Sequence, residues 1–152
     1  MRRAALLLSL IVLAGCGGDD EPEQTPEAFV TTLIRQLGTG QASSAWEELH
    51  PEHRERVPRQ LYVRCEKGDP FGGEVEKIDV LEVKPEPATV PGTFGERPST
   101  AVTVGVTLKP EAGETERFSM TAHVFETDGQ WSWVIGPVDF ASYMAGQCPA
   151  QG

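Results

Sequence analysis

Residues 118–135, FSMTAHVFETDGQWSWVI, decide the fold. Apolar and polar side chains alternate from Phe118 to Val124, which is the period of a half-buried strand. The pair Asp128-Gly129 then predicts a tight turn between two strands. After the turn, apolar side chains recur at every second position, so we expect the last two strands to form an antiparallel hairpin. These side chains are Trp131, Trp133 and Ile135.

Two further strands are predicted upstream of this hairpin. Residues 102–108 alternate cleanly between apolar and polar side chains, which again indicates a half-buried strand. Residues 75–83 are rich in β-branched side chains, but their alternation is irregular and suggests a bulge. Residues 84–100 are rich in proline and predict a long loop between the two strands.

The part of the chain before the strands is predicted to be helical. Thr25, Pro26 and Glu27 are typical of a helix start, and apolar side chains then repeat at helical spacing up to Gly38. Further helical segments are predicted at residues 40–50, 58–65 and 137–148. Helices followed by an antiparallel meander predict an α+β domain, with the N-terminal helices packed on one face of a curved antiparallel sheet.

The first fifteen residues have the layout of a secretory signal peptide. Arg2 and Arg3 precede an apolar run of eleven residues, 4–14, which only Ser9 interrupts. A helix that spans a bilayer needs about 20 residues, so this run is too short for a permanent span. We therefore expect a segment that is removed after export.

The sequence LAGC at residues 13–16 resembles the lipobox of bacterial lipoproteins. The resemblance implies that the signal is cut directly before Cys16 and that Cys16 then carries the lipid. The alternative is an ordinary secreted protein in which Cys16 is a free thiol. The lipoprotein interpretation places the protein on the extracytoplasmic face of the cell membrane, with the membrane itself as a partner through the lipid on Cys16.

These features predict three parts: a lipoprotein signal peptide at residues 1–15, a flexible acidic tether at 16–25, and a single α+β domain at 26–149. Without the signal peptide the chain has 11 Lys and Arg against 23 Asp and Glu, a net charge of −12. Sequence-independent nucleic-acid binding depends on clustered Lys and Arg, so we expect no nucleic-acid partner. A role for the acidic surface in binding a basic partner stays open, beside the simpler role of solubility.

Two cysteines follow Cys16, at positions 65 and 148. Outside the cytoplasm such a pair is more often bridged than free, so we expect a disulfide between Cys65 and Cys148. The bridge would close a loop of 83 residues. In the chain-entropy model such a loop stabilises the fold by about 4–5 kcal/mol. The alternative is two unpaired buried thiols.

The order of elements resembles the nuclear transport factor 2-like superfamily. AWEELHP at 45–51, LYVRC at 61–65 and DGQWSWV at 128–134 are similar to small secreted bacterial lipoproteins with that fold. The resemblance implies a cone-shaped domain whose interior is either a pocket or packed core. Its catalytic members need a carboxylate base facing a tyrosine or an acid. The predicted inner face contains no carboxylate, so no catalytic residue is assigned; it consists of Val102, Val104, Val106, Phe118, Met120, Ala122, Trp131 and Trp133.

Two of the histidines are candidate metal ligands. His50 and His53 lie three residues apart among glutamates, and such groups can bind zinc. Pro51 lies between them and arginines follow, so we expect a helix–turn junction with solvated charges, and neither a metal nor a cofactor. His123 is out of phase with the apolar positions of its strand, and is expected to face solvent or a covering element.

Several large side chains could line an apolar cavity with a few polar tips, the usual composition of a ligand site. The alternative is that they form plain core. The candidates are Trp46, Tyr62, Met120, Trp133, Phe140 and Tyr143. The leading hypothesis is a non-catalytic, membrane-anchored module that binds an envelope protein or a small apolar ligand. The alternative function is an enzyme that uses the cone cavity on a small substrate.

Overall fold

The computed structural model describes residues 24–67, 71, 73–109 and 113–150. The predicted signal peptide, most of the tether and Cys16 lie outside the described residues. The helices are α1 (Pro26–Gly38), α2 (Ala42–Glu47), α3 (Pro51–Arg56), α4 (Arg59–Cys65) and α5 (Pro137–Met144). The strands are β1 (Glu74–Pro85), β2 (Thr100–Lys109), β3 (Glu116–Thr127) and β4 (Gln130–Trp133). Within the described ranges, no helix is long and apolar enough to cross a membrane.

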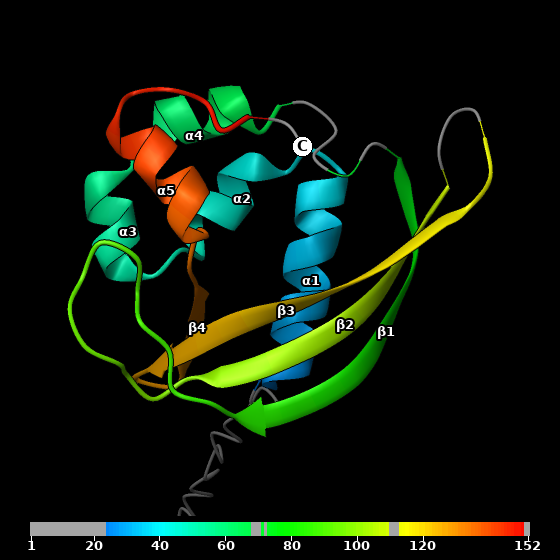
Figure 1. The fold of residues 1–152 in the computed structure, drawn as a ribbon, viewed down its shortest axis with the longest axis horizontal. Helices are drawn as coiled ribbons and strands as arrows, with labels where there is room; N and C mark the ends of the chain where they lie inside the picture. The colour runs from blue at the N-terminus through cyan, green and yellow to red at the C-terminus, as the bar shows by residue number, and fades with distance from the viewer. Residues whose placement is uncertain (1–23, 68–70, 72, 110–112, 151–152) are drawn as a thin grey trace, which may run out of the picture.

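The strands form one antiparallel sheet in the order β1-β2-β3-β4, and the helices gather on one side of it (Figure 1). The predicted α+β class is therefore confirmed. The irregularity expected in β1 is also present, because its pairing with β2 shifts register between Val75 and Lys77 and again between Val80 and Glu82. The predicted loop between β1 and β2 covers residues 86–99, a little less than expected, because both strands extend into its ends.

The main core lies between α1 and the sheet. Thr25 caps the helix by accepting a hydrogen bond from the backbone N–H of Ala28 at 3.3 Å, and Pro26 occupies the first turn. The apolar face of α1 packs on side chains that β2 points inward, and all are nearly inaccessible to water. This sheet core contains Phe29, Val30, Leu33, Ile34, Val102, Val104, Val106 and Leu108.

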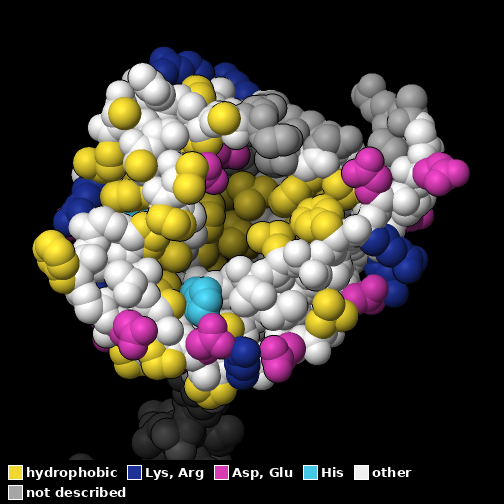
Figure 2. Space-filling view, viewed as in Figure 1, with side chains coloured by type: hydrophobic (Ala, Val, Ile, Leu, Met, Phe, Trp, Pro, Cys, Tyr) yellow, Lys and Arg dark blue, Asp and Glu magenta, His cyan; other side chains and the backbone are white. Residues whose placement is uncertain are grey.

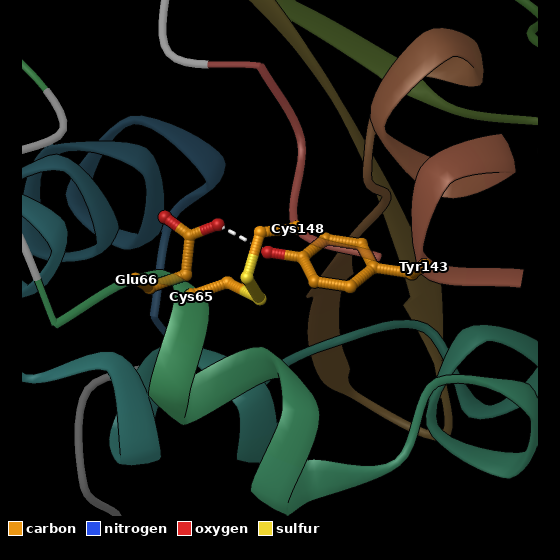
Figure 3. The surroundings of a disulfide bond; sticks show 4 residues. All are labelled: Cys65, Glu66, Tyr143 and Cys148. Carbon is orange, nitrogen blue, oxygen red and sulfur yellow. Dashed lines mark hydrogen bonds between the residues drawn. A yellow bond between two sulfur atoms is a disulfide. The ribbon is translucent and has the colours of Figure 1, made fainter. Parts of the chain in front are cut away.

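A second core lies among α2, α4 and α5. This helical core contains Ala42, Leu49, Val57, Leu61, Tyr62, Ile135, Phe140 and Tyr143. The disulfide between Cys65 and Cys148 confirms the predicted bridge and fastens the C-terminal segment to the end of α4 (Figure 3). Beside it, the Tyr143 hydroxyl donates a hydrogen bond to the Glu66 carboxylate.

The segment around His53 differs from the sequence-based expectation. Pro51 begins the helix α3 rather than a turn, because proline suits the first helical position, where its missing N–H has no helical partner. The His53 side chain is fully buried and His50 is nearly so. The prediction of a junction with solvated charges was therefore wrong for both histidines.

The strand β4 is short. It pairs with β3 only over the four residues from Val124 to Thr127. On its other side, Trp133 donates its backbone N–H to Glu48 O at 3.1 Å and accepts from His50 N–H at 2.7 Å. The outer edge of β4 is thus covered at Trp133, whereas the first two-thirds of β3 extend past the end of β4.

Candidate functional site

A cleft opens where β3 extends past β4. After Trp133 the chain turns away from β3 toward α5, and the gap between them forms a hollow of about 460 Å³. Figure 2 shows this hollow as a concave surface with mainly apolar side chains at its base. Its volume lies in the range of small-ligand sites, roughly 300–1,000 Å³.

The walls of the cleft come from four segments. The apolar face of α1 contributes the base, β3 one side, residues 133–139 the opposite side, and the loop 86–99 one end. The apolar lining consists of Val30, Leu33, Ile34, Leu37, Ala88, Pro91, Met120, Ala122, Trp133, Val134, Ile135 and Pro137. The arrangement suits the burial of an apolar group.

The backbone of β3 also faces the cleft, and the hydrogen bonds of β4 show which groups do so. Trp133 directs both its N–H and its C=O away from β3, so Val124 and Trp133 are a non-hydrogen-bonded pair. Val124 therefore directs its backbone groups toward β2. The backbone groups of successive residues in a strand point to opposite edges. Pairing with β2 continues without a register shift from Thr100 to Leu108, so the backbone N–H and C=O groups of Thr121 and His123 point away from β2, toward the cleft.

These edge groups have no partner in the described part of the chain. No backbone or side-chain hydrogen bond to the main-chain N–H or C=O of Thr121 or His123 exists on that side among those residues. Met120, Thr121, Ala122 and His123 all contact the hollow, as expected where a strand edge rather than one strand face lines a cleft. The cleft thus combines apolar side chains with unpaired backbone donors and acceptors.

Among the described residues, the ionisable groups that line the cleft are His123 and Asp139, and both lie near its rim. The His123 ring contacts Ser99 Oγ at 3.4 Å and Glu86 Oε1 at 3.6 Å, so it faces the covering loop, in agreement with the sequence-based expectation. Asp139 is exposed at the start of α5. Within the described residues, no lysine or arginine lines the cleft. A buried acid–base pair is therefore not part of this lining.

The six residues predicted as a possible pocket lie in two places. Met120 and Trp133 line the cleft. The other four pack in or against the helical core: Trp46, Tyr62, Phe140 and Tyr143. There the Trp46 indole donates to Val57 O at 3.1 Å, and the Tyr62 ring lies 5.6 Å from that of Tyr143. Burial raises the pKa of both tyrosine hydroxyls, and the nearby Glu66 adds to the effect.

Sequence reasoning missed the α1 side chains and the backbone edge as cleft components. The apolar residues of α1 were expected to pack on the sheet. They do so, and the same side chains also form the base of the cleft. An edge of backbone groups has no side-chain signature. The available signal was the early end of the last strand, since Gly136-Pro137 follows soon after Trp133 and cannot extend a ladder.

Both ring nitrogens of His53 are engaged in hydrogen bonds within the protein. Its Nδ1 accepts from the Ile135 backbone N–H at 3.1 Å, and its Nε2 lies 3.0 Å from Pro91 O. The ring stacks on Phe140 with centroids 4.3 Å apart. Burial lowers the pKa of His53, which agrees with a neutral ring in this position. In the described ranges, no group of three or more His, Cys, Asp or Glu is placed to hold a metal ion.

A second, more polar hollow of about 360 Å³ lies beside the β3–β4 turn. Glu48 lines it and accepts a hydrogen bond from Gln36 Nε2 at 3.0 Å. Burial raises the pKa of this carboxyl group, although the bond from Gln36 opposes the shift. Arg54 and Asp128 also border this hollow, so its walls are mixed in charge and it lacks the continuous apolar lining of the cleft.

Comparison with known proteins supports the fold. No protein-family model matches this chain, and no curated protein matches it. Among solved structures, it is similar to a SEC-C motif containing protein from Rhodopseudomonas palustris (TM-score 0.53, 12% identity, 74% of this chain and 77% of that one). It is also similar to a putative NTF2-like transpeptidase from Campylobacter jejuni (TM-score 0.50, 14% identity, 74% of this chain and 99% of that one).

At these identities the likeness concerns the fold alone. The helices on a four-stranded antiparallel sheet, together with the second neighbour, show that the chain has a nuclear transport factor 2-like fold. The fold class predicted from the sequence is thereby confirmed. Since one fold hosts many functions, the function has to be argued from the cleft.

Proposed function

We propose that the protein is a non-catalytic binding module, held by a lipid on Cys16 at the extracytoplasmic face of the cell membrane. Its cleft takes an apolar ligand or an apolar segment of an envelope protein. The lipid anchor concentrates the domain near such partners, which raises the occupancy of a modest-affinity site.

The observation that carries the binding role is the composition of the cleft. About 460 Å³ of space is bounded mainly by apolar side chains, and its ionisable groups lie at the rim. Catalysis of the ketosteroid isomerase kind needs a carboxylate facing the substrate from inside the cone. Asp139 is exposed at the mouth and His123 faces Ser99 and Glu86, so neither occupies such a position.

Two observations support the location. LAGC at residues 13–16 follows a short apolar run, as in lipoproteins. The disulfide between Cys65 and Cys148 is typical of proteins that fold outside the reducing cytoplasm. Cys16 itself lies outside the described residues, so the anchor rests on the sequence motif.

The binding role is tested with Nile red, an uncharged apolar dye, on the full chain carrying Cys16→Ser. Ala122→Phe would fill the cleft from β3 and is expected to weaken dye binding at least about tenfold, since it displaces an apolar group worth on the order of 1.5–3 kcal/mol. Ala141→Phe makes the same change on the exposed side of α5, and serves as the matched control. Equal dye binding by both variants would contradict a ligand site in the cleft.

The anchor is tested by membrane fractionation and mass spectrometry. The native chain is expected to sediment with membranes and to carry a lipid mass on an N-terminal Cys16, whereas Cys16→Ser should be released into the soluble fraction. A Cys16→Ser protein that still sedimented with membranes would refute the anchor. A native product with an unmodified Cys16 thiol would do the same.

A further inference from the structure

We infer that the cleft binds an extended peptide segment of a partner protein, apolar in its centre and basic at its ends, which adds as a strand to the open edge of β3. This inference rests on the proposed binding function and names the chemical class of its ligand. It follows from three independent features of the cleft: its backbone edge, its side-chain lining and its charge.

The backbone edge favours a polypeptide over other apolar ligands. Thr121 and His123 present two N–H and two C=O groups toward the cleft, and these groups have no partner among the described residues. An extended peptide offers donors and acceptors at the matching interval along a strand. A hydrocarbon ligand would instead bury these polar groups without hydrogen bonds, which is unfavourable.

The side chains that flank this edge suit alternate residues of such a strand. In an added strand, every second side chain would point to the face that Met120 and Ala122 share. That face borders Leu33, Leu37 and Trp133, so apolar side chains at alternate peptide positions would be buried there. The other side chains would face outward, past Thr121 and His123.

The charges around the cleft favour basic residues at the ends of the peptide. Asp139 lines the mouth, and Glu86, which also pairs with Lys84 Nζ at 2.9 Å, lies beside His123 at the other wall. Acidic side chains stand at several points around the hollow in Figure 2, while no lysine or arginine of the described chain lines it. The formal net charge of the whole chain, −10, has the same sign. Lysine or arginine flanks would therefore be attracted to this rim.

The outer edge of β1 is much less suited to the same role. This strand carries two register shifts, and bulges twist an edge away from further pairing. Its exposed side chains are mostly charged, and Lys77 and Asp79 form an ion pair along it. Charged, bulged edges of this kind resist strand addition. The edge of β3 has no bulge over residues 117–123, and residues 118–122 carry no charged side chain.

Amide hydrogen exchange measured by NMR tests the inference directly. The probe is the blocked nine-residue peptide KKVTVTVKK, added to the full chain carrying Cys16→Ser. Binding is expected to slow exchange of the Thr121 and His123 amides at least about tenfold. The Met120 and Ala122 amides already point to β2 and should change little. Peptide binding without protection of Thr121 and His123 would overturn strand addition.

A pair of substitutions tests the edge from the side of the protein. Thr121→Pro removes one N–H that points to the cleft and leaves the bonds to β2 in place, so peptide affinity should fall about fivefold or more. The substitution also disturbs the 2.8 Å hydrogen bond between the hydroxyls of Thr103 and Thr121. Thr103→Val removes the same bond from β2, and should bind the peptide like the parent chain. Equal losses in both variants would overturn the inference.

Modified peptides test the same bonds from the side of the ligand, even if Thr121→Pro does not fold. N-methylation of the three valines and N-methylation of the two threonines block opposite edges of the strand. One modified peptide should therefore bind at least about tenfold more weakly than the other. Equal binding of the two would exclude a strand, and stronger binding of a peptide with glutamate ends would exclude the basic flanks.

The outcomes separate this inference from the proposed function. If Nile red binds in the cleft and Ala122→Phe blocks it, but the peptide does not protect the Thr121 and His123 amides, the inference is overturned and the binding function stands. Failure of dye and peptide together would overturn both. A dimer in sedimentation that Thr121→Pro abolishes would make a second copy of this chain the occupant, and would overturn the assignment to a partner protein.

Discussion

His53 connects segments that lie far apart in the sequence. From α3 it reaches Pro91 in the loop 86–99 and Ile135 after β4, and it stacks on Phe140 of α5. Two arginines add further links between α3 and the loop 86–99. Arg56 donates a hydrogen bond to Gly92 O, and Arg97 pairs with Glu52. Because the loop 86–99 and the segment after β4 both line the cleft, α3 acts through these contacts as a support for its walls.

The burial of His53 predicts a loss of stability in mild acid. Burial lowers the pKa of His53 and of His50 below the ordinary value of 6.5. Below that pH the unfolded chain therefore binds more protons than the folded chain, and the free energy of unfolding falls as the pH falls. The slope should reach at most about 1.4 kcal/mol per pH unit for each histidine, measured by urea unfolding between pH 8 and pH 5.5.

Substitution of His53 identifies its share of this slope. His53→Gln keeps one donor and one acceptor but loses the ring stacked on Phe140, so it should cost about 1–2 kcal/mol at pH 8. Its unfolding free energy should depend less on pH than that of the parent chain, with only the part due to His50 left. A variant that retained the full slope of the parent would show that His53 does not titrate as proposed.

At the scale of elements, the sequence predicted what local patterns determine. The capped start of α1 at Thr25, the alternation in β2 and the turn at Asp128-Gly129 each depend on neighbours in the chain, and each is present in the structure. The start of α3 at Pro51 was missed because proline both begins and breaks helices, and the sequence alone does not say which.

The cleft could not be predicted in the same way. Trp46 and Trp133 were both candidates for the pocket, yet Trp46 packs against the helical core, whereas Trp133 packs against both cores and lines the cleft. The difference depends on where β4 ends relative to β3, which is a tertiary property. Met120 was placed on the correct face by its period of two, but the unpaired edge beside it depends on the path of residues 134–137.

The β3–β4 hairpin depends on the left-handed backbone of its turn. Asp128 and Gly129 have φ of 53° and 75°, as a two-residue turn requires at both positions. Gly129→Ala should lower the free energy of unfolding by about 1 kcal/mol, because a Cβ is unfavourable there. Gly136 has φ of −57° with open space around it, so Gly136→Ala should be neutral or slightly stabilising. Equal thermal shifts in the two variants would contradict this explanation.

At the scale of the molecule, two apolar cores share one small chain. The sheet core holds α1 against β2, and the helical core holds α2, α4 and α5 together, while Trp133 packs against both. Its indole donates to Ala45 O at 2.8 Å, which fixes the end of β4 against α2. The cleft lies along the boundary between the two cores, so its shape depends on how the helical core is held.

The disulfide is the main covalent constraint on the helical core, and its removal should affect the whole molecule. The bridge joins residues 83 apart and holds the C-terminal segment on α4 beside Tyr143 and Glu66. In the chain-entropy model, its loss frees the unfolded chain and costs about 4–5 kcal/mol, a large share of the roughly 5–15 kcal/mol typical of a domain. The double variant Cys65→Ala/Cys148→Ala should therefore unfold at a much lower urea concentration than the oxidised parent. Its m-value should rise, because an unbridged unfolded chain exposes more surface.

Reduction of the parent chain should give the same midpoint as the double variant, since both lack the same loop closure. An unchanged midpoint would show that α4 and α5 are held by packing alone, and that the bridge contributes little to the boundary on which the cleft lies.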